Sequence, residues 1–307
     1  MQQTYPAARN TFLFGEPSGF FHPFEQIEST ETPLRDPLLA FKTNLSSAFQ
    51  VGNIPFKITQ AAVIGQRYNQ LCIAEKIRSG ADPEDEEADK IARKTASTHL
   101  QNELKDKEII DRFSEETLWR LDNHLNDEEF IDSAHELLRQ VLVICWGAFE
   151  ILVNDTLKVL LNVRPHLIRA FQNNKPYREL LSGEIILDAL AANEFNISTT
   201  MGDIFCEVVR LDSLEKIREA VHLCIAEPAV DTILKDERLW RISQQRHLIV
   251  HRRGIVDPQY LRRTSDRATV GEHLRLDGKY IETSLVLVRD IGCNLYEAAR
   301  KRLSTVD

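Results

Sequence analysis

The stretch DEEFIDSAHELLRQVLVICWGAFEILVNDTLKVLL, residues 127–161, decides the fold of this chain. Its apolar residues recur at steps of three or four, the spacing that places side chains on one face of an α-helix. It predicts a long amphipathic helix that begins at Asp127, runs through Leu161 and is ended by Pro165. The stripe consists of Leu137, Val141, Ile144, Ala148, Ile151, Leu152, Thr156, Val159 and Leu160.

The segments that follow repeat this helical pattern in shorter form. Gly254 supplies a C-terminal stop for the helix expected over residues 228–250. Between Gly271 and Leu285, apolar positions nearly alternate around Asp277-Gly278, a dipeptide that favours a tight hairpin turn. We therefore expect a mainly α fold, a helical bundle over residues 127–307 with a small β-hairpin near the C-terminus. The expected helices are 165–173, 184–192, 201–210, 214–226, 228–250 and 286–303.

Residues 1–126 form a separate region in this prediction, and the sequence assigns no role to it. More than half of the 11 prolines lie within residues 1–58, interleaved with aromatic residues. We expect this segment to be a partly extended arm that packs on another surface without long helices. Helical spacing begins at Thr59, stops at Gly80, and resumes in a charged stretch to about Lys107 and again from Ser114.

Composition excludes several classes of protein. The formal net charge of −9 argues against a protein that coats nucleic acid by bulk electrostatics, although arginines crowd residues 238–275. No run of about 18 to 20 apolar residues is present, and residues 1–23 lack the basic start and apolar core of a secretory signal. We therefore expect a cytoplasmic location and no membrane partner.

The segment RHLIVH, Arg246 to His251, carries the candidate chemistry. Five residues rise about 7.5 Å along a helix, so a long Arg side chain can reach toward the imidazole of His251. Histidine titrates near neutrality and can move a proton, while arginine offers permanently charged donors to phosphoryl oxygens. These two groups suffice for RNA transesterification, in which the ribose 2′-hydroxyl attacks the adjacent phosphate. The sequence predicts neither a metal site nor a cofactor, since metal-ligand spacings and glycine-rich phosphate loops are missing.

The same segment resembles the motif R-[N/D/H]-x-x-x-H of the HEPN superfamily. These all-α bundles occur in ribonucleases of toxin–antitoxin pairs, phage-defence systems and CRISPR-associated effectors. The continuation HRRGIVD, residues 251–257, is similar to the corresponding stretch of stand-alone HEPN proteins, and Trp146 to Glu150 looks like part of an early bundle helix. The resemblance covers about residues 127–307, whereas residues 1–125 match no family that we recognise.

This resemblance implies a metal-independent endoribonuclease, the effector of a bacterial toxin or defence system. Arg246 and His251 correspond to the active pair, and His247 to the intervening polar residue. Two protomers of such proteins place their motifs in one cleft, which implies a homodimer with a composite site. Arg252 and Arg253 would then add phosphate contacts to the RNA substrate. Glu150 would orient an Arg or a His across the bundle.

Two alternatives remain open at this point: a non-catalytic module, and the neutralised half of a two-gene pair that is inactive until its partner is removed. The chain can be a non-catalytic HEPN-like module that binds RNA or a protein partner, including an antitoxin or another defence-system protein. In that case Arg246 and His251 would serve a helix end and pair with carboxylates such as Asp236 or Asp257. The six-residue pattern alone is degenerate, so its structural setting has to discriminate between these interpretations.

Overall fold

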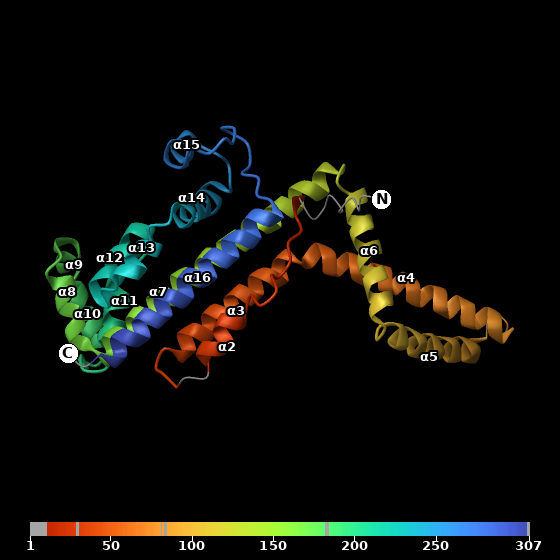
Figure 1. Ribbon diagram of the computed structural model, residues 1–307, viewed down its shortest axis with the longest axis horizontal. Helices are drawn as coiled ribbons and strands as arrows, with labels where there is room; N and C mark the ends of the chain where they lie inside the picture. Colours follow the sequence, from red (N-terminus) through yellow and green to blue (C-terminus); the bar gives the residue numbers. More distant parts are fainter. Residues whose placement is uncertain (1–10, 29–30, 81, 83–84, 182–183, 306–307) are drawn as a thin grey trace. The chain divides into compact units, whose positions relative to one another are not determined.

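The chain is described from a computed structural model over residues 11–28, 31–80, 82, 85–181 and 184–305. It is mainly helical, as expected (Figure 1). Two compact units divide it: one comprises the described residues of 1–14 and 51–137, the other those of 15–50 and 138–307. This division differs from the expected boundary after residue 126, because the second unit includes a segment near the N-terminus. Long helix α7, Glu128–Val163, begins in the first unit and continues in the second.

The helices keep the labels of Figure 1. The first unit contains α4 Ile54–Ser79, α5 Glu86–Glu103, α6 Lys107–Asn123 and the start of α7. The other helices are α2 His22–Glu28, α3 Arg35–Gly52, the short 3₁₀ helix η1 Pro165–Leu167, α8 Ile168–Gln172, α9 Lys175–Leu180, α10 Glu184–Ala192, α11 Met201–Val208, α12 Leu214–Ile225, α13 Pro228–Ile233, α14 Glu237–Arg252, α15 Pro258–Thr264 and α16 Gly278–Ser304.

Two long helices, α7 and α16, run side by side and parallel through the second unit (Figure 1). The Cys145 thiol, at the middle of α7, lies 3.9 Å from the carbonyl of Ser284 near the beginning of α16, and the guanidinium of Arg164, just after α7, donates to the carbonyl of Leu303 near the end of α16. Gly292 of α16 lies so close to α3 that an added Cβ would come within 2.5 Å of Phe41. The buried faces of α7 and α16 therefore form the core on which the shorter helices pack.

The prediction of an arm without long helices was wrong for residues 15–58. Helix α3 has 18 residues, and Pro37 occupies its third position. The first four N–H groups of a helix have no intrahelical acceptor, so a proline there removes no helical hydrogen bond. Phe20 and Phe24 are fully buried, so this segment packs into the core of its unit. Residues 1–10, also part of the expected arm, lie outside the described residues.

The expected hairpin around Asp277-Gly278 was also wrong. Asp277 is the N-cap of α16, and its carboxylate accepts from the backbone N–H of Tyr280 at 2.7 Å. An aspartate before a glycine serves a helix start as well as a turn, because its side chain accepts an orphan N–H. Among the described residues the β-pairing is one isolated antiparallel bridge, between Ile255 and His273.

Most of the predicted helices are confirmed. The longest begins at Glu128 and ends at Val163, within two residues of the expected ends. Gly80 ends α4 in the left-handed conformation, as its position suggested. The expected helix 228–250 is two helices, α13 and α14. The helix is interrupted at Asp236, whose carboxylate accepts the N–H of Arg238 and caps the start of α14. No helix in the described part of the chain is long and apolar enough to span a bilayer.

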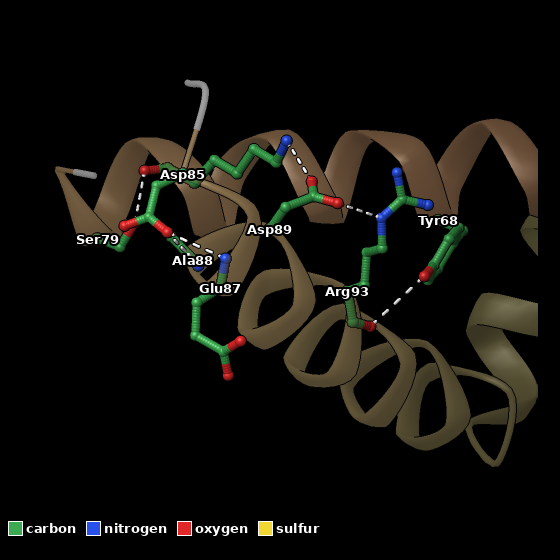
Figure 2. Close-up of polar contacts among 8 residues, drawn as sticks. Tyr68, Ser79, Asp85, Glu87, Ala88, Asp89 and Arg93 are labelled. Atoms are coloured by element: carbon green, nitrogen blue, oxygen red, sulfur yellow. Dashed lines mark hydrogen bonds and ion pairs between the residues drawn. The ribbon is translucent and has the colours of Figure 1, made fainter. Parts of the chain in front are cut away.

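In the first unit, polar contacts join the helices in addition to buried apolar side chains such as Val63, Ala92 and Ala96. Helix α5 lies along α4, where Asp89 bridges Lys76 and Arg93 and the hydroxyl of Tyr68 donates to the carbonyl of Arg93 (Figure 2). The Asp85 carboxylate accepts the N–H groups of Glu87 and Ala88 and thereby starts α5 (Figure 2). Arg67 pairs with Glu103 through two hydrogen bonds farther along the same contact.

The turn after α14 generates a stability prediction. Gly254 has φ of +74°, and a Cβ there would lie 2.9 Å from the Cδ of the buried Arg139, which donates to the carbonyl of Leu274. We expect Gly254→Ala to lower the free energy of unfolding by more than the roughly 1–2 kcal/mol of left-handed strain alone, measured by denaturant unfolding.

Gly271→Ala is the matched control for Gly254→Ala. Gly271 has φ of +89°, but a Cβ there would meet no atom within 4 Å, so it carries the strain without the clash. Equal losses for the two variants would contradict a specific role for the contact between Gly254 and Arg139.

Candidate active site

Helix α14 presents the motif residues from a well-anchored backbone. The Asp236 carboxylate caps its N-terminus, and Arg253, in the left-handed conformation, donates its N–H to the carbonyl of Leu248 at the C-terminus. Leu248 and Ile249, two of the apolar residues within the motif, are buried. Gln245 of α14 is contacted from α16, where the hydroxyl of Tyr280 donates to its side chain at 2.5 Å. The positions of the motif residues are therefore fixed from both ends and from the core side.

Arg246 forms an ion pair with Glu150, which lies 96 positions earlier in the chain on α7. Nη2 of Arg246 lies 3.1 Å from Oε2 of Glu150, and the two side chains are only 26% and 17% exposed. Glu150, which we expected to orient an Arg or a His across the bundle, thus contacts Arg246 of the motif. Nε of Arg246 is buried and has no hydrogen-bond partner among the described residues.

The surroundings of Glu150 have opposing effects on the pKa of its carboxyl. Burial raises the pKa of this carboxyl, against the opposing effects of a hydrogen bond from Trp146 and the positive charge of Arg246, and nearby Asp212 raises it further. Arg246 therefore compensates only part of the cost of burying a carboxylate at this position. The pair is a constrained contact between two helices and differs from the exposed ion pairs found elsewhere on the surface.

The two histidines of the motif lie one helical turn apart and contact each other. The ring centroids of His247 and His251 are 4.5 Å apart, with planes inclined at 47°. Burial, followed by the positive fields of His251, Arg263 and Arg246, lowers the pKa of His247. The neutral imidazole of His247 is therefore favoured near neutral pH, the form that can accept a proton.

A surface cleft of about 830 Å³ brings these groups together within the second unit. Arg246, His247 and His251 all line it, so the structure places the predicted active pair on one surface. Their neighbours come from α7, from the start of α12, from α14 itself and from α15. These other lining residues are Trp146, Asp212, Ser213, Leu214, Glu215, Trp240, Ser243, Gln244, Val250 and Arg263.

The remaining predicted arginines, Arg252 and Arg253, do not line the cleft. Arg252 lines a smaller hollow of about 100 Å³ that shares Gln244, His247 and Arg263 with the cleft. Its Nε lies 3.8 Å from a carboxylate oxygen of Asp257. Arg253 is exposed and acts as the C-cap of α14, and it does not line either hollow.

The carboxylates proposed as alternative partners of Arg246 are engaged with other arginines. Asp236 binds Arg238 through side-chain hydrogen bonds of 2.6 to 3.2 Å, and Asp257 faces Arg252. Asp257 also caps α15 by accepting the N–H of Tyr260 at 2.7 Å. The contact that the structure shows for Arg246 is the one with Glu150.

Several lining residues were missed by the sequence analysis. Gln244 lies three residues before His247 on α14, and Trp240 lies four residues before Gln244. All three therefore share one face of the helix, and a helical projection from His247 would have found the other two. Asp212 and Arg263 come from other elements and reach the cleft only through the tertiary fold. Nη1 of Arg263 donates to the Gln244 side chain at 3.2 Å, which positions its charge beside His247.

Among the described residues, no three His, Cys, Asp or Glu side chains are grouped so that they could hold a metal ion. Comparison of the chain with models of known protein families, with curated proteins and with solved structures finds no match. The geometry of the cleft therefore provides the basis on which a function can be assigned.

The electrostatic coupling within the cleft is testable. Removing the positive charge of Arg263 should raise the pKa of His247, because that charge disfavours the imidazolium form. The measurement is an NMR titration of the histidine side chains in Arg263→Ala and wild type, with His247→Gln to assign the resonance. Arg262→Ala is the control, because Arg262 is an exposed residue of the same helix, α15, and does not line the cleft. A His247 pKa that is unchanged, or that responds equally to both variants, would refute the coupling.

Proposed function

We propose that this chain is a metal-independent endoribonuclease of the HEPN type that acts as a homodimer with a composite Arg/His site. The observation that carries the proposal is the setting of Arg246: a guanidinium held by Glu150 on the wall of a cleft that also exposes His247 and His251. An arginine that served only a helix end would not need a counter-charge from another helix. The resemblance to HEPN ribonucleases adds the expectation of a toxin or phage-defence effector.

The proposed chemistry uses groups of this chain. An imidazole takes the proton of a ribose 2′-hydroxyl, whose oxygen attacks the adjacent phosphorus. The bond from phosphorus to the 5′-oxygen breaks, and a protonated imidazole supplies the proton to that leaving group. The products are a 2′,3′-cyclic phosphate and a 5′-hydroxyl. Arg246 stabilises the negative charge on the phosphoryl oxygens, because its guanidinium keeps further N–H donors beyond the one directed at Glu150.

Two copies of the site explain the need for a dimer. One imidazole cannot act as base and acid in the same step, so His251 from each protomer would fill one of the two roles. His247, with its lowered pKa, is suited to assist as a base beside His251. Arg252 and Arg263 lie where neighbouring phosphates of the strand would pass, and Trp240 offers a half-buried indole on which a base can stack.

A second candidate function is binding without catalysis. Asp212 and Glu215 line the cleft and would repel phosphates, which favours a protein partner that carries basic residues. An antitoxin or another defence-system protein of that chemistry would neutralise the cleft when bound. The two candidates differ in one observable, the cleavage of RNA by the isolated chain.

The test is the incubation of purified protein with total RNA in EDTA. We expect wild type to cleave, and Arg246→Ala and His251→Ala each to lose at least about 100-fold in rate, the usual effect of removing a proton-transfer group or a transition-state donor. His222→Ala and Arg262→Ala are the controls, since both residues are exposed and lie outside the lining of the cleft. Their rates should match that of wild type.

Other outcomes reject the proposal. Equal cleavage by wild type and by both site variants would show a contaminating nuclease, and binding of RNA without any cleavage would favour the second candidate. Cleavage that is abolished by EDTA and restored by a divalent cation would contradict the metal-independent mechanism.

A further inference from the structure

Two acidic residues line the cleft, and they differ in what they contact. The Asp212 carboxylate pairs with Lys216 at 2.9 Å. Among the described residues, Glu215 forms no side-chain hydrogen bond or ion pair, although it lines the same cleft. Arg218, one turn further along α12, senses the charge of Glu215 but donates its Nε to the carbonyl of Leu234 at 2.6 Å. The carboxylate oxygens of Glu215 are therefore available to a ligand in the cleft.

The backbone that carries Glu215 is held in place. Glu215 is the second residue of α12, which Ser213 caps by accepting the N–H of Lys216 at 3.4 Å. Leu214 and Ile217, on either side of this turn, are buried. A side chain on a fixed backbone loses less freedom on binding than one on a mobile loop, so more of its hydrogen-bond energy appears as affinity.

A carboxylate in this cleft needs a role other than contact with phosphates. Arg246 and Arg263 supply the positive charge that phosphates require, whereas a carboxylate only accepts hydrogen bonds. The donors that RNA offers to a carboxylate are its ribose hydroxyls and the N–H groups of its bases. The hydroxyls are the same in every nucleotide, so any selectivity of Glu215 depends on the bases.

The four bases differ in the donors on their Watson–Crick edges. Guanine presents two adjacent donors, N1–H and the N2 amino group, which match the two oxygens of one carboxylate. Adenine and cytosine each place an acceptor nitrogen beside the amino group, and uracil has one N–H between two carbonyls. A bidentate, charge-assisted pair is the strongest of these arrangements. A carboxylate therefore selects guanine in single-stranded RNA, where the Watson–Crick edges are free to be read.

Trp240 supplies a surface on which such a base can lie. Its indole is half-buried and lines the cleft. Arg246 follows it on α14 after a rise of about 9 Å, so a base stacked on Trp240 lies close to a phosphate held by Arg246. Stacking on an aromatic ring favours no particular base, whereas a carboxylate does. The effects of Trp240 and Glu215 are therefore separable.

We propose that Glu215 is a specificity-determining residue that reads guanine next to the scissile phosphate. Its two oxygens accept from N1–H and from the N2 amino group while the base stacks on Trp240. This inference rests on the proposed function, because it takes single-stranded RNA as the ligand of the cleft. It gives Glu215 a role in RNA binding, where otherwise its charge would only repel the strand.

Binding of uncleavable RNA to the full chain tests the preference. The probes are fluorescent 2′-O-methyl hexanucleotides of uridine whose two central bases are guanine, hypoxanthine, adenine, cytosine or uracil, and fluorescence anisotropy gives each dissociation constant. The guanine probe should bind roughly 5- to 150-fold more tightly than the adenine probe, the discrimination that one good bidentate pair provides. Hypoxanthine keeps N1–H but lacks the amino group, so its affinity should fall between the two.

Variants assign the preference to a side chain. Glu215→Gln should lower the affinity for the guanine probe at least about 5-fold, because the amide replaces one acceptor by a donor. Its affinity for the adenine probe should be unchanged or higher, because a negative charge is removed. Trp240→Ala should weaken all probes by a similar factor and keep the preference. Glu272→Gln, at an exposed carboxylate that does not line the cleft, should change neither.

Equal affinity of the wild type for all probes overturns the proposal, as does an absence of RNA binding. A preference that is lost in Asp212→Asn and kept in Glu215→Gln overturns the assignment to Glu215. Equal losses on both probes do the same when Glu215→Gln unfolds at the wild-type denaturant concentration. Cleavage of total RNA is measured separately. Guanine-selective binding without cleavage would support this inference and reject the catalytic function, whereas cleavage without selective binding would do the reverse.

Discussion

The ion pair between Glu150 and Arg246 is the constraint on which the candidate site depends. It joins the central helix α7 to α14, and both side chains are largely removed from solvent. Breaking a pair of this kind is costly because it leaves one charge buried without a counter-charge. Its net contribution to stability is smaller, since burial raises the pKa of Glu150 even with Arg246 beside it. The pair is therefore better understood as fixing the place of a guanidinium than as strengthening the fold.

The surroundings of α14 agree with this interpretation. The helix is capped at both ends, its apolar residues Leu248 and Ile249 are buried, and Tyr280 holds it from α16. Arg246 and the two histidines thus extend from a rigid helix into a cleft. Rigid placement of polar groups is what catalysis of phosphoryl chemistry requires, because positioning and electrostatic stabilisation provide most of the rate enhancement.

Much of the fold was predictable from the sequence, because helical periodicity and capping residues act locally. The ends of α7 and the stops at Gly80 and Gly254 followed from such patterns. The errors arose where one residue type serves two structures: Asp277 caps a helix instead of opening a hairpin, and Pro37 lies in the first turn of α3, where a proline does not prevent a helix. Within the site, the motif residues were predictable from spacing, whereas Asp212 and Arg263 come from other segments and required the tertiary structure.

The most direct test of the central claim is a double-mutant cycle with Glu150→Gln and Arg246→Gln, each measured by denaturant unfolding at neutral pH. If the pair is a specific contact, the summed losses of the two single variants should exceed the loss of the double variant, with a coupling free energy between roughly 0.5 and 3 kcal/mol. Additive losses, agreeing within about 0.5 kcal/mol, would show that the two side chains do not interact in solution and would remove the physical basis of the site.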